Sequence, residues 1–160
     1  MYTIEPITPR TRALVTAFIE QAWHGTEMRI RGEAVDMTLV EGFVWFAPDG
    51  MAILGLITYI FREGACEITS LNSLYENRGT GTALVELVKE TARAHGCSLL
   101  RLITTNDNVN AIKFYQKRGF GLAGINLGAI DKERAQKPEI PLIGQNGIPI
   151  HHEIEFAMKL

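Results

Sequence analysis

The sequence predicts an α/β fold built on a mixed sheet, and two observations carry this prediction. Apolar runs of strand length alternate with amphipathic segments of helical period along the whole chain. In addition, a strand, a helix and a second strand follow one another over residues 65–105, which predicts a parallel pair joined by a right-handed crossover. At 160 residues the chain is expected to form one domain, 1–160, without metal or disulfide support.

The first quarter of the chain predicts one strand and one helix. Residues 2–7 alternate as a strand does, and Thr8-Pro9 is typical of a helix N-cap followed by proline at the first helical position. Apolar residues then recur at helical spacing, which predicts a helix over about 9–22. Residues 23–38 are polar and aperiodic, so a short helix and a loop both remain open there.

Three apolar runs come next and predict three strands. The runs at 39–47 and 51–61 flank Pro48-Asp49-Gly50, which is a hairpin signal. Gly64 separates them from a third run at 65–72. The second half then alternates between helices and strands, and its expected elements are an amphipathic helix ended by His95-Gly96, a strand at 98–105, a helix at 109–118 closed by Gly119, a strand at 120–127, a helical piece at 131–137 and a last strand at about 150–159.

Composition excludes several classes of function. The net charge is −2 and no basic run occurs, so we expect no nucleic-acid partner. No apolar run is long enough to predict a membrane span, and the N-terminus lacks the order of a signal peptide, so a cytoplasmic protein without a membrane partner is expected. Cys66 and Cys97 are isolated, which predicts buried, reduced thiols and no metal site.

A glycine-rich turn precedes the amphipathic helix and reads Arg78-Gly79-Thr80-Gly81-Thr82-Ala83. Free backbone N–H groups, the helix dipole and the Arg78 charge could together cradle a pyrophosphate. A plain tight turn is the alternative. A dinucleotide fingerprint is disfavoured because Leu84 stands where a small residue is needed, and a P-loop is disfavoured because Gly81 is followed by Thr82 rather than lysine.

Two motifs together resemble the GCN5-related N-acetyltransferase (GNAT) superfamily. The first is Arg78-x-x-Gly81-x-Ala83, and the second is Asn108-x-x-Ala111-x-x-x-Tyr115-x-x-x-Gly119-Phe120. The resemblance implies the GNAT fold, a mostly antiparallel mixed sheet with a splayed parallel pair and flanking helices. It also implies acetyl-CoA as co-substrate, with a cofactor-binding core at about 65–125 and these contacts: Leu71, Ser73, Leu74, Arg78, Gly79, Thr80, Gly81, Thr82, Ala83, Asn108, Ala111 and Tyr115.

Acetyl transfer to an amine requires a base, an oxyanion site and an acid for the leaving thiolate. The resemblance gives Tyr115 the role of acid, although a packing aromatic is the alternative. Asn108 resembles the pantetheine-binding asparagine and could equally cap the following helix. Backbone N–H groups near Leu71 to Leu74 would meet the oxyanion.

Glu67 is the first candidate for the base, because it is an acid within an apolar strand. Strand alternation would place it on one face with Thr69 and Leu71. A solvent-facing strand residue is the alternative, and His151 and His152 are second candidates.

Two segments could form the acceptor side, residues 23–37 and the proline- and glycine-rich excursion 128–149. The candidate substrate-binding residues are Trp23, Arg29, Glu67 and His151. The predicted function is transfer of an acetyl group from acetyl-CoA to a primary amine of a small molecule or peptide by direct attack. The alternative is a catalytically silent CoA-binding or sensing module of the same fold. A homodimer is possible through pairing of the apolar last strand.

Overall fold

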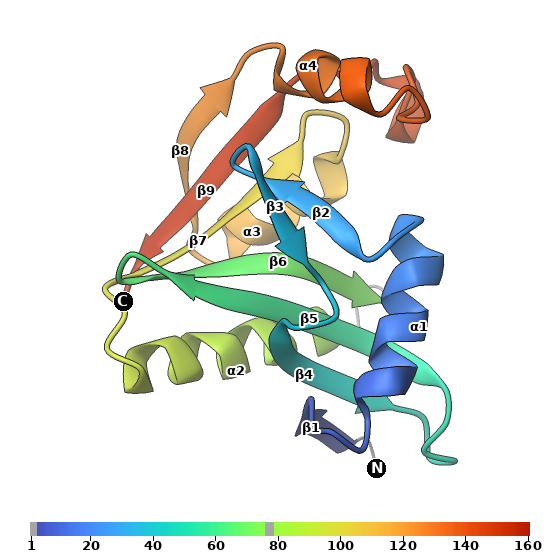
Figure 1. Cartoon of the computed structure of the whole chain (residues 1–160). Coiled ribbons are helices and arrows are strands. Elements are labelled where there is room, and N and C mark those ends of the chain that lie inside the picture. Colours follow the sequence, from blue (N-terminus) through green and yellow to red (C-terminus); the bar gives the residue numbers. More distant parts are fainter. Residues whose placement is uncertain (1–2, 76–78) are drawn as a thin grey trace. The chain divides into compact units, whose positions relative to one another are not determined.

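The computed structural model describes residues 3–75 and 79–160 (Figure 1). The chain divides into two compact units, and each is described by itself. The N-terminal unit comprises residues 1–98 with Leu160, and the C-terminal unit comprises residues 99–159. The single domain expected from the sequence stays a prediction.

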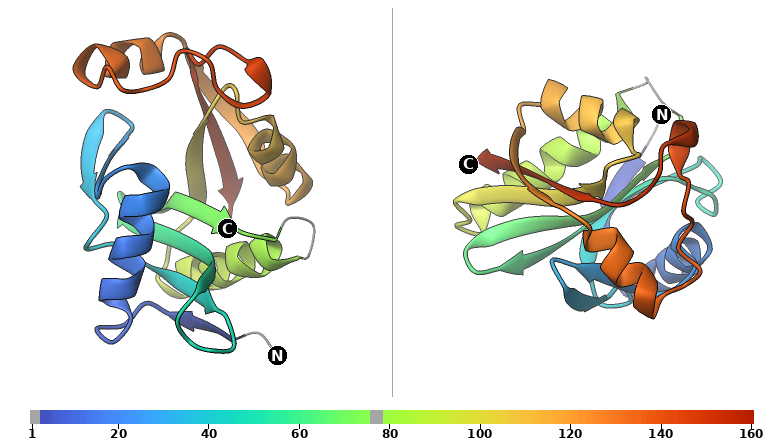
Figure 2. Two further views of the ribbon diagram at one scale, coloured as in Figure 1. Left: turned by 90° about the vertical axis from the view of Figure 1, so that its right-hand side faces the viewer. Right: turned by 90° about the horizontal axis from the view of Figure 1, so that it is seen from above.

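The N-terminal unit is an antiparallel sheet with a helix on each face. Its strands pair in the order β1 (Thr3–Pro6), β4 (Glu41–Phe46), β5 (Ile53–Arg62) and β6 (Ala65–Ser73). Helix α1 (Arg12–Trp23) and helix α2 (Thr80–Ala94) cover opposite faces of this sheet (Figure 2). The prediction that α2 is amphipathic is confirmed. Its buried residues are Leu84, Val85, Val88 and Ala92.

Helix α1 begins three residues later than Thr8-Pro9 suggested. The carbonyl of Thr8 accepts hydrogen bonds from the N–H groups of Thr11 and Arg12, and the hydroxyl of Thr11 accepts one from the N–H of Thr8. Thr8 therefore opens a turn, and Thr11 is the residue at the N-cap position. The proline lies in that turn and not in the first turn of the helix.

Residues 23–38 contain neither a second helix nor a plain loop. They form a separate hairpin of β2 (Glu27–Ile30) and β3 (Glu33–Asp36), joined by Arg31-Gly32. Arg31 and Gly32 have φ angles of 54° and 77°, the positive values that a two-residue type I′ turn requires. Charged residues hide the alternation in these short strands, but Ile30 and Val35 are both buried.

A β-bulge in β6 changes which residues share a face. Glu67 pairs with Ile60 of β5 and Leu71 pairs with Ile57, and the register shifts between them. Because Ile57 and Ile60 are three residues apart, they point to opposite faces of β5, and so do their partners. The prediction that Glu67, Thr69 and Leu71 share one face is therefore wrong.

The C-terminal unit is a second antiparallel group of strands. Strand β9 (Glu153–Lys159) lies between β7 (Leu99–Thr105) and β8 (Gly121–Asn126). Helix α3 (Val109–Lys117) follows β7, while α4 (Ala129–Gln136) and the short helix η1 (Gln145–Gly147) lie in the excursion before β9. The last strand starts at Glu153, three residues later than expected. Phe156, at the centre of β9, is fully buried.

The predicted fold class is confirmed: the chain is an α/β protein with a mixed, mostly antiparallel sheet and flanking helices. Cys66 and Cys97 are buried free thiols, as expected. Burial raises the pKa of Cys66 to about 12, which makes it a poor nucleophile at neutral pH. Within 3–75 and 79–160, no helix combines the length and the apolar character that crossing a membrane requires.

Candidate functional site

The glycine turn leads directly into α2. Gly79 occupies the N-cap position with φ 77°, a conformation that suits glycine, and its carbonyl accepts the N–H of Ala83 at 3.0 Å. The first turn then contains Thr80, Gly81 and Thr82, and it carries no acidic side chain among its described residues. Within this described first turn no carboxylate neutralises the positive end of the helix dipole, which fits a phosphate group. Arg78 lies outside the described residues.

The end of β6 provides the next predicted contacts. The N–H of Leu74 donates to the carbonyl of Leu54 at 2.9 Å, and the hydroxyl of Ser73 donates to the carbonyl of Tyr75 at 3.3 Å. The Leu74 amide is therefore engaged within the sheet. Leu71 and Ser73, whose N–H groups alternate with that of Leu74, remain the better candidates for backbone donors to an oxyanion.

Of the two roles that the sequence left open for Asn108, the structure shows the helix cap. Its Oδ1 accepts the N–H of Ala111 at 3.1 Å, so it is the N-cap of α3. Its Nδ2 has no acceptor among the described residues. The side chain can thus cap the helix with its oxygen and still offer two N–H donors to a ligand.

Tyr115 lies in the core of the C-terminal unit and is 6% exposed. Its ring packs against Phe114, Phe120 and Phe156, with centroids 5.1, 5.4 and 6.1 Å away. Burial raises the pKa of Tyr115 well above the ordinary value of a phenol, so the hydroxyl keeps its proton at neutral pH. Within the described part of the chain no group hydrogen-bonds to that hydroxyl. The ring of Tyr115 can therefore pack in the core while its hydroxyl keeps a proton that it could donate.

Glu67 is fully buried and ion-paired, where the sequence suggested a partly desolvated acid. Its Oε1 lies 2.5 Å from Nε of Arg31, and Nη2 of Arg31 donates to Oε2 at 3.4 Å. Arg31 is thus a site residue that the sequence reading did not select. The available signal was the Arg31-Gly32 pair between two short alternating segments, which is a hairpin signal.

Of the other acceptor-side candidates, Trp23 and Arg29 belong to the N-terminal unit and His151 belongs to the C-terminal unit. Trp23 is 40% exposed, and its Nε1 donates to Oδ1 of Asn72 on β6 at 3.1 Å, so it does not belong to the core. Asn72 and Glu67 lie on the same face of β6, because their partners Leu56 and Ile60 are four residues apart on β5. Arg29 is exposed and donates to the carbonyl of Gly32 at 3.3 Å.

In the C-terminal unit, His151 forms a hydrogen bond with Asp131 of α4. Its Nδ1 lies 2.9 Å from Oδ1 of Asp131. The hydrogen bond from His151 is the main reason that the pKa of Asp131 falls below its ordinary value. The pair leaves the second ring nitrogen of His151 for other contacts.

The excursion 128–149 is held in place by three polar side chains. Arg134 donates to the carbonyls of Ile140, Pro141 and Ile150 at 3.1, 2.9 and 2.7 Å. Asp107 accepts the N–H of Gln145 at 2.9 Å, and Asn106 accepts the N–H groups of His151 and His152, each at 2.9 Å. The sequence predicted a proline- and glycine-rich excursion here but not these anchors. Their signal was the polar run Asn106-Asp107-Asn108 directly after a strand.

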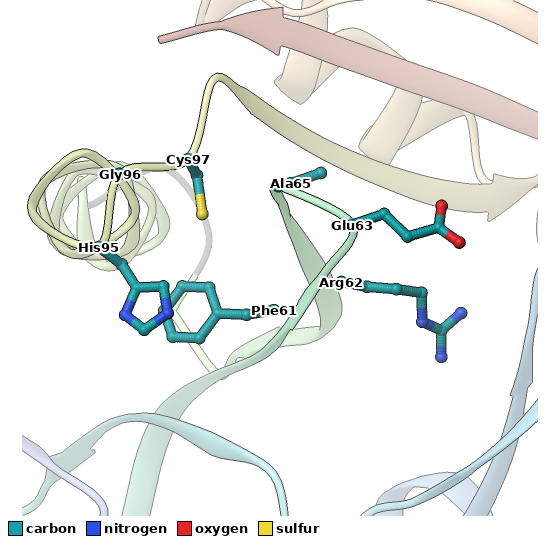
Figure 3. A pocket seen from close by; sticks show the side chains of 8 residues that line it. Phe61, Arg62, Glu63, Ala65, His95, Gly96 and Cys97 are labelled. Atoms are coloured by element: carbon teal, nitrogen blue, oxygen red, sulfur yellow. The ribbon is translucent and has the colours of Figure 1, made fainter.

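A hollow of about 270 Å³ lies elsewhere in the N-terminal unit (Figure 3). It is formed by the β5–β6 turn and the C-terminal end of α2, where the ring of His95 stacks on Phe61 with a centroid distance of 3.8 Å. The predicted phosphate-binding turn is at the other end of α2, and none of the predicted site residues lines this hollow. Among the described residues, no cluster of His, Cys, Asp and Glu could hold a metal ion.

Comparison with known proteins gives a consistent result. The family described as Acetyltransferase (GNAT) family matches residues 10–120. Uncharacterized protein YxbD of Bacillus subtilis is 42% identical over 157 residues, which is 98% of both chains. Two solved structures share the fold: an IAA acetyltransferase from Bacillus cereus, with TM-score 0.71, 23% identity and full coverage of both chains, and a GNAT family acetyltransferase from Elizabethkingia anophelis with acetyl-CoA bound, with TM-score 0.72, 21% identity and coverage of 99% and 98%.

Proposed function

The chain belongs to the acetyltransferase (GNAT) family, and from this premise we propose that it moves an acetyl group from acetyl-CoA to a primary amine of a small molecule or peptide. The single observation that carries the proposal is the family match over residues 10–120. This range includes both the turn that opens α2 and the helix that contains Asn108 and Tyr115. The acetyl-CoA bound to the structurally similar Elizabethkingia enzyme supports the choice of co-substrate.

The residues described above divide the tasks of cofactor binding between them. The backbone from Gly79 to Ala83 would bind the pyrophosphate, because it combines a glycine turn with a helix N-terminus free of acidic groups in its described first turn. The Nδ2 of Asn108 would donate to the pantetheine arm. Acetyl-CoA supplies the activated acyl group, and the protein's part is to bind and orient it.

Two side chains would move protons. Tyr115 holds a proton firmly at neutral pH and would give it to the departing thiolate sulfur. Glu67 would take a proton from the acceptor's ammonium group. Backbone N–H groups of Leu71 and Ser73 would stabilise the negative charge that develops on the carbonyl oxygen. Cys66, with its raised pKa, is unsuited to a covalent route, which favours direct attack by the amine.

We further propose that the enzyme is cytoplasmic. Two buried thiols without a disulfide suit a reducing compartment. The acceptor would approach the side of the N-terminal unit that carries Glu67, Trp23 and the β2–β3 hairpin. The proposal also includes His151 as an acceptor contact and a homodimer as the assembly.

Calorimetry with acetyl-CoA, CoA and NAD tests this function, with Gly81→Glu as the matched variant. Micromolar binding of both CoA species without NAD binding is expected for the natural protein, followed by thiol release in an amine screen. Gly81→Glu should abolish CoA binding, because it adds bulk and negative charge at the start of α2, while circular dichroism stays unchanged. Undiminished binding in the variant would show that the turn does not hold phosphate, and no CoA binding in the natural protein would remove the enzyme proposal.

A further inference from the structure

Three hydroxyl groups meet in the buried part of the β5–β6 strand pair. The hydroxyl oxygen of Thr58 lies 2.7 Å from that of Thr69 and 2.5 Å from that of Ser70. The three residues are 0%, 7% and 5% exposed. A buried hydroxyl costs free energy unless it is hydrogen-bonded, so three of them at one point of the core indicate a specific task.

The three hydroxyls mark the position of the β-bulge. Thr58 pairs with Ser70, and the next residue of β5, Tyr59, pairs with Ile68. Thr69 is therefore the extra residue, and together with Ser70 it lies opposite Thr58. Because the Thr58 hydroxyl contacts both hydroxyls, one side chain of β5 holds the two residues of β6 that form the bulge.

The bulge decides where the backbone N–H groups of the following residues point. The N–H of Leu74 donates to the carbonyl of Leu54 on β5. Because the direction of backbone N–H groups alternates along a strand, those of Leu71 and Ser73 point away from β5. These two are the proposed donors to the carbonyl oxygen of the thioester. A slip of one residue at the bulge would turn both of them towards β5.

We propose that Thr58 is a positioning residue for acetyl transfer: its hydroxyl fixes the bulge and thereby aims the N–H groups of Leu71 and Ser73 at the thioester oxygen. This inference rests on the proposed function. Thr58 itself is fully buried, so it acts through β6 and not by contact with substrate. Donors stabilise a developing oxyanion only when they are held in place, so a loosened bulge should weaken catalysis and leave binding of the CoA part intact.

The test compares Thr58→Val with the natural protein. Valine keeps the shape of threonine and removes the hydroxyl. We expect kcat to fall at least about tenfold, because the two backbone donors lose their alignment. Affinity for CoA, measured by calorimetry, should stay within about twofold, because CoA has no acyl carbonyl for these donors to bind.

The infrared band of the acetyl carbonyl reports on the donors without relying on turnover. Hydrogen bonds to the carbonyl oxygen should lower the stretching frequency of isotope-labelled acetyl-CoA when it binds to the natural protein. In Thr58→Val the band should move back towards that of free acetyl-CoA. A side chain that only supports the fold would not change this band in a folded, CoA-binding variant.

Two variants of the same cluster give a graded comparison. Thr58→Ser keeps the hydroxyl and should behave like the natural protein in kcat and in the carbonyl band. Ser70→Ala removes one of the two partners of Thr58 and should change both quantities in the same direction as Thr58→Val but by less. Circular dichroism and thermal unfolding show whether each variant is folded.

Thr11→Val is the matched control outside the bulge. Thr11 is fully buried like Thr58, and its hydroxyl oxygen accepts the N–H of Thr8 at 3.0 Å in the turn before α1. Loss of this hydroxyl should lower the melting temperature, as loss of the Thr58 hydroxyl does. The carbonyl band should stay where it is in the natural protein.

The outcomes separate this inference from the function on which it rests. A natural kcat and carbonyl band in Thr58→Val, or an equal change in Thr11→Val, would overturn the positioning role. Failure of CoA binding by the natural protein would instead overturn the acetyltransferase proposal. Amide hydrogen exchange without CoA would then still decide the structural step: the amides of residues 69–73 should exchange faster in Thr58→Val than in Thr11→Val, and equal rates would show that Thr58 does not fix the bulge.

Discussion

At the scale of single residues, the site depends on groups whose surroundings fix one chemical state. Tyr115 is held neutral by three aromatic neighbours, and Asn108 is oriented by the hydrogen bond that caps α3. Glu67 is buried and accepts a hydrogen bond from Arg31, which lies 36 positions away in the sequence. Each of these states can be tested by a substitution that changes one property and keeps the shape.

Tyr115→Phe removes the proposed proton donor and keeps the aromatic packing. We expect kcat to fall roughly 100-fold, as for loss of a general acid, while calorimetric affinity for CoA and the melting temperature stay close to those of the natural protein. Phe114→Leu, which alters the neighbouring ring but keeps the hydroxyl, is the matched control. Full turnover in Tyr115→Phe would assign the residue to packing alone.

Asn108→Ser separates the two roles of that side chain. The serine hydroxyl can still cap α3, so thermal stability should stay within about 0.5 kcal/mol. The amide donor is lost, so CoA should bind more weakly. Asn108→Ala, which loses the cap as well, should cost about 1 kcal/mol in urea unfolding. Equal CoA affinity in all three proteins would show that Asn108 only caps the helix.

At the scale of elements, the segments between the strands carry the features that distinguish this chain. The β2–β3 hairpin supplies Arg31, and the excursion before β9 is fixed by Arg134, Asn106 and Asp107. Both segments combine a few buried apolar side chains with specific hydrogen bonds. Their stability should therefore respond to the loss of a single hydrogen-bonded contact as well as to the loss of apolar burial.

Gly144→Ala tests the anchoring of the excursion. A Cβ at this position would overlap the Asp107 carboxylate and the Ile150 side chain, so one of them must move. We expect a loss of about 1–3 kcal/mol in the free energy of unfolding, measured by urea denaturation. Gln145→Ala is the control, because only the backbone N–H of Gln145 bonds to Asp107. Similar stability of both variants would mean that the excursion adapts freely.

At the scale of the whole molecule, the two compact units differ in what they contribute. The N-terminal unit holds the phosphate-binding turn, the proposed base and the hairpin, and the C-terminal unit holds Asn108, Tyr115 and the anchored excursion. Global stability depends on the cores of both, including a buried phenol in the N-terminal unit.

The raised pKa of Tyr59 predicts how the stability of the folded protein changes at alkaline pH. Burial, followed by the nearby charge of Glu41, raises the pKa of Tyr59 from 10.0 to about 12. The folded state therefore favours the neutral phenol, and this contribution is complete below pH 10 and is lost as the pH rises through 12. We expect Tyr59→Phe to reduce the loss of stability between pH 10 and pH 12 by about 1–2 kcal/mol.

Urea denaturation at pH 8, 10 and 12 checks this expectation. Tyr75→Phe is the control, because Tyr75 is 47% exposed whereas Tyr59 is 4% exposed. The same alkaline sensitivity in the natural protein and in Tyr59→Phe would mean that other groups govern unfolding at high pH.

The sequence by itself determined the features that local chemistry controls. The period of the apolar residues was sufficient for α2, β4, β5, β7 and α3, and glycines marked the ends of helices at Gly96 and Gly119. The two motifs, Arg78 to Ala83 and Asn108 to Phe120, were sufficient to indicate the family. In each case neighbours in the sequence decide the outcome, because turn conformation and helix capping depend on a few adjacent residues.

Only the tertiary structure decided which distant groups meet. The bulge in β6 turned Glu67 and Leu71 to opposite faces, although strict alternation predicted one face. The pairing of Arg31 with Glu67, and of Asp107 with the backbone at Gln145, joins residues 36 and 38 positions apart. Such contacts follow from strand register and loop path, which many sequence positions set together, so no local pattern in the chain reports them.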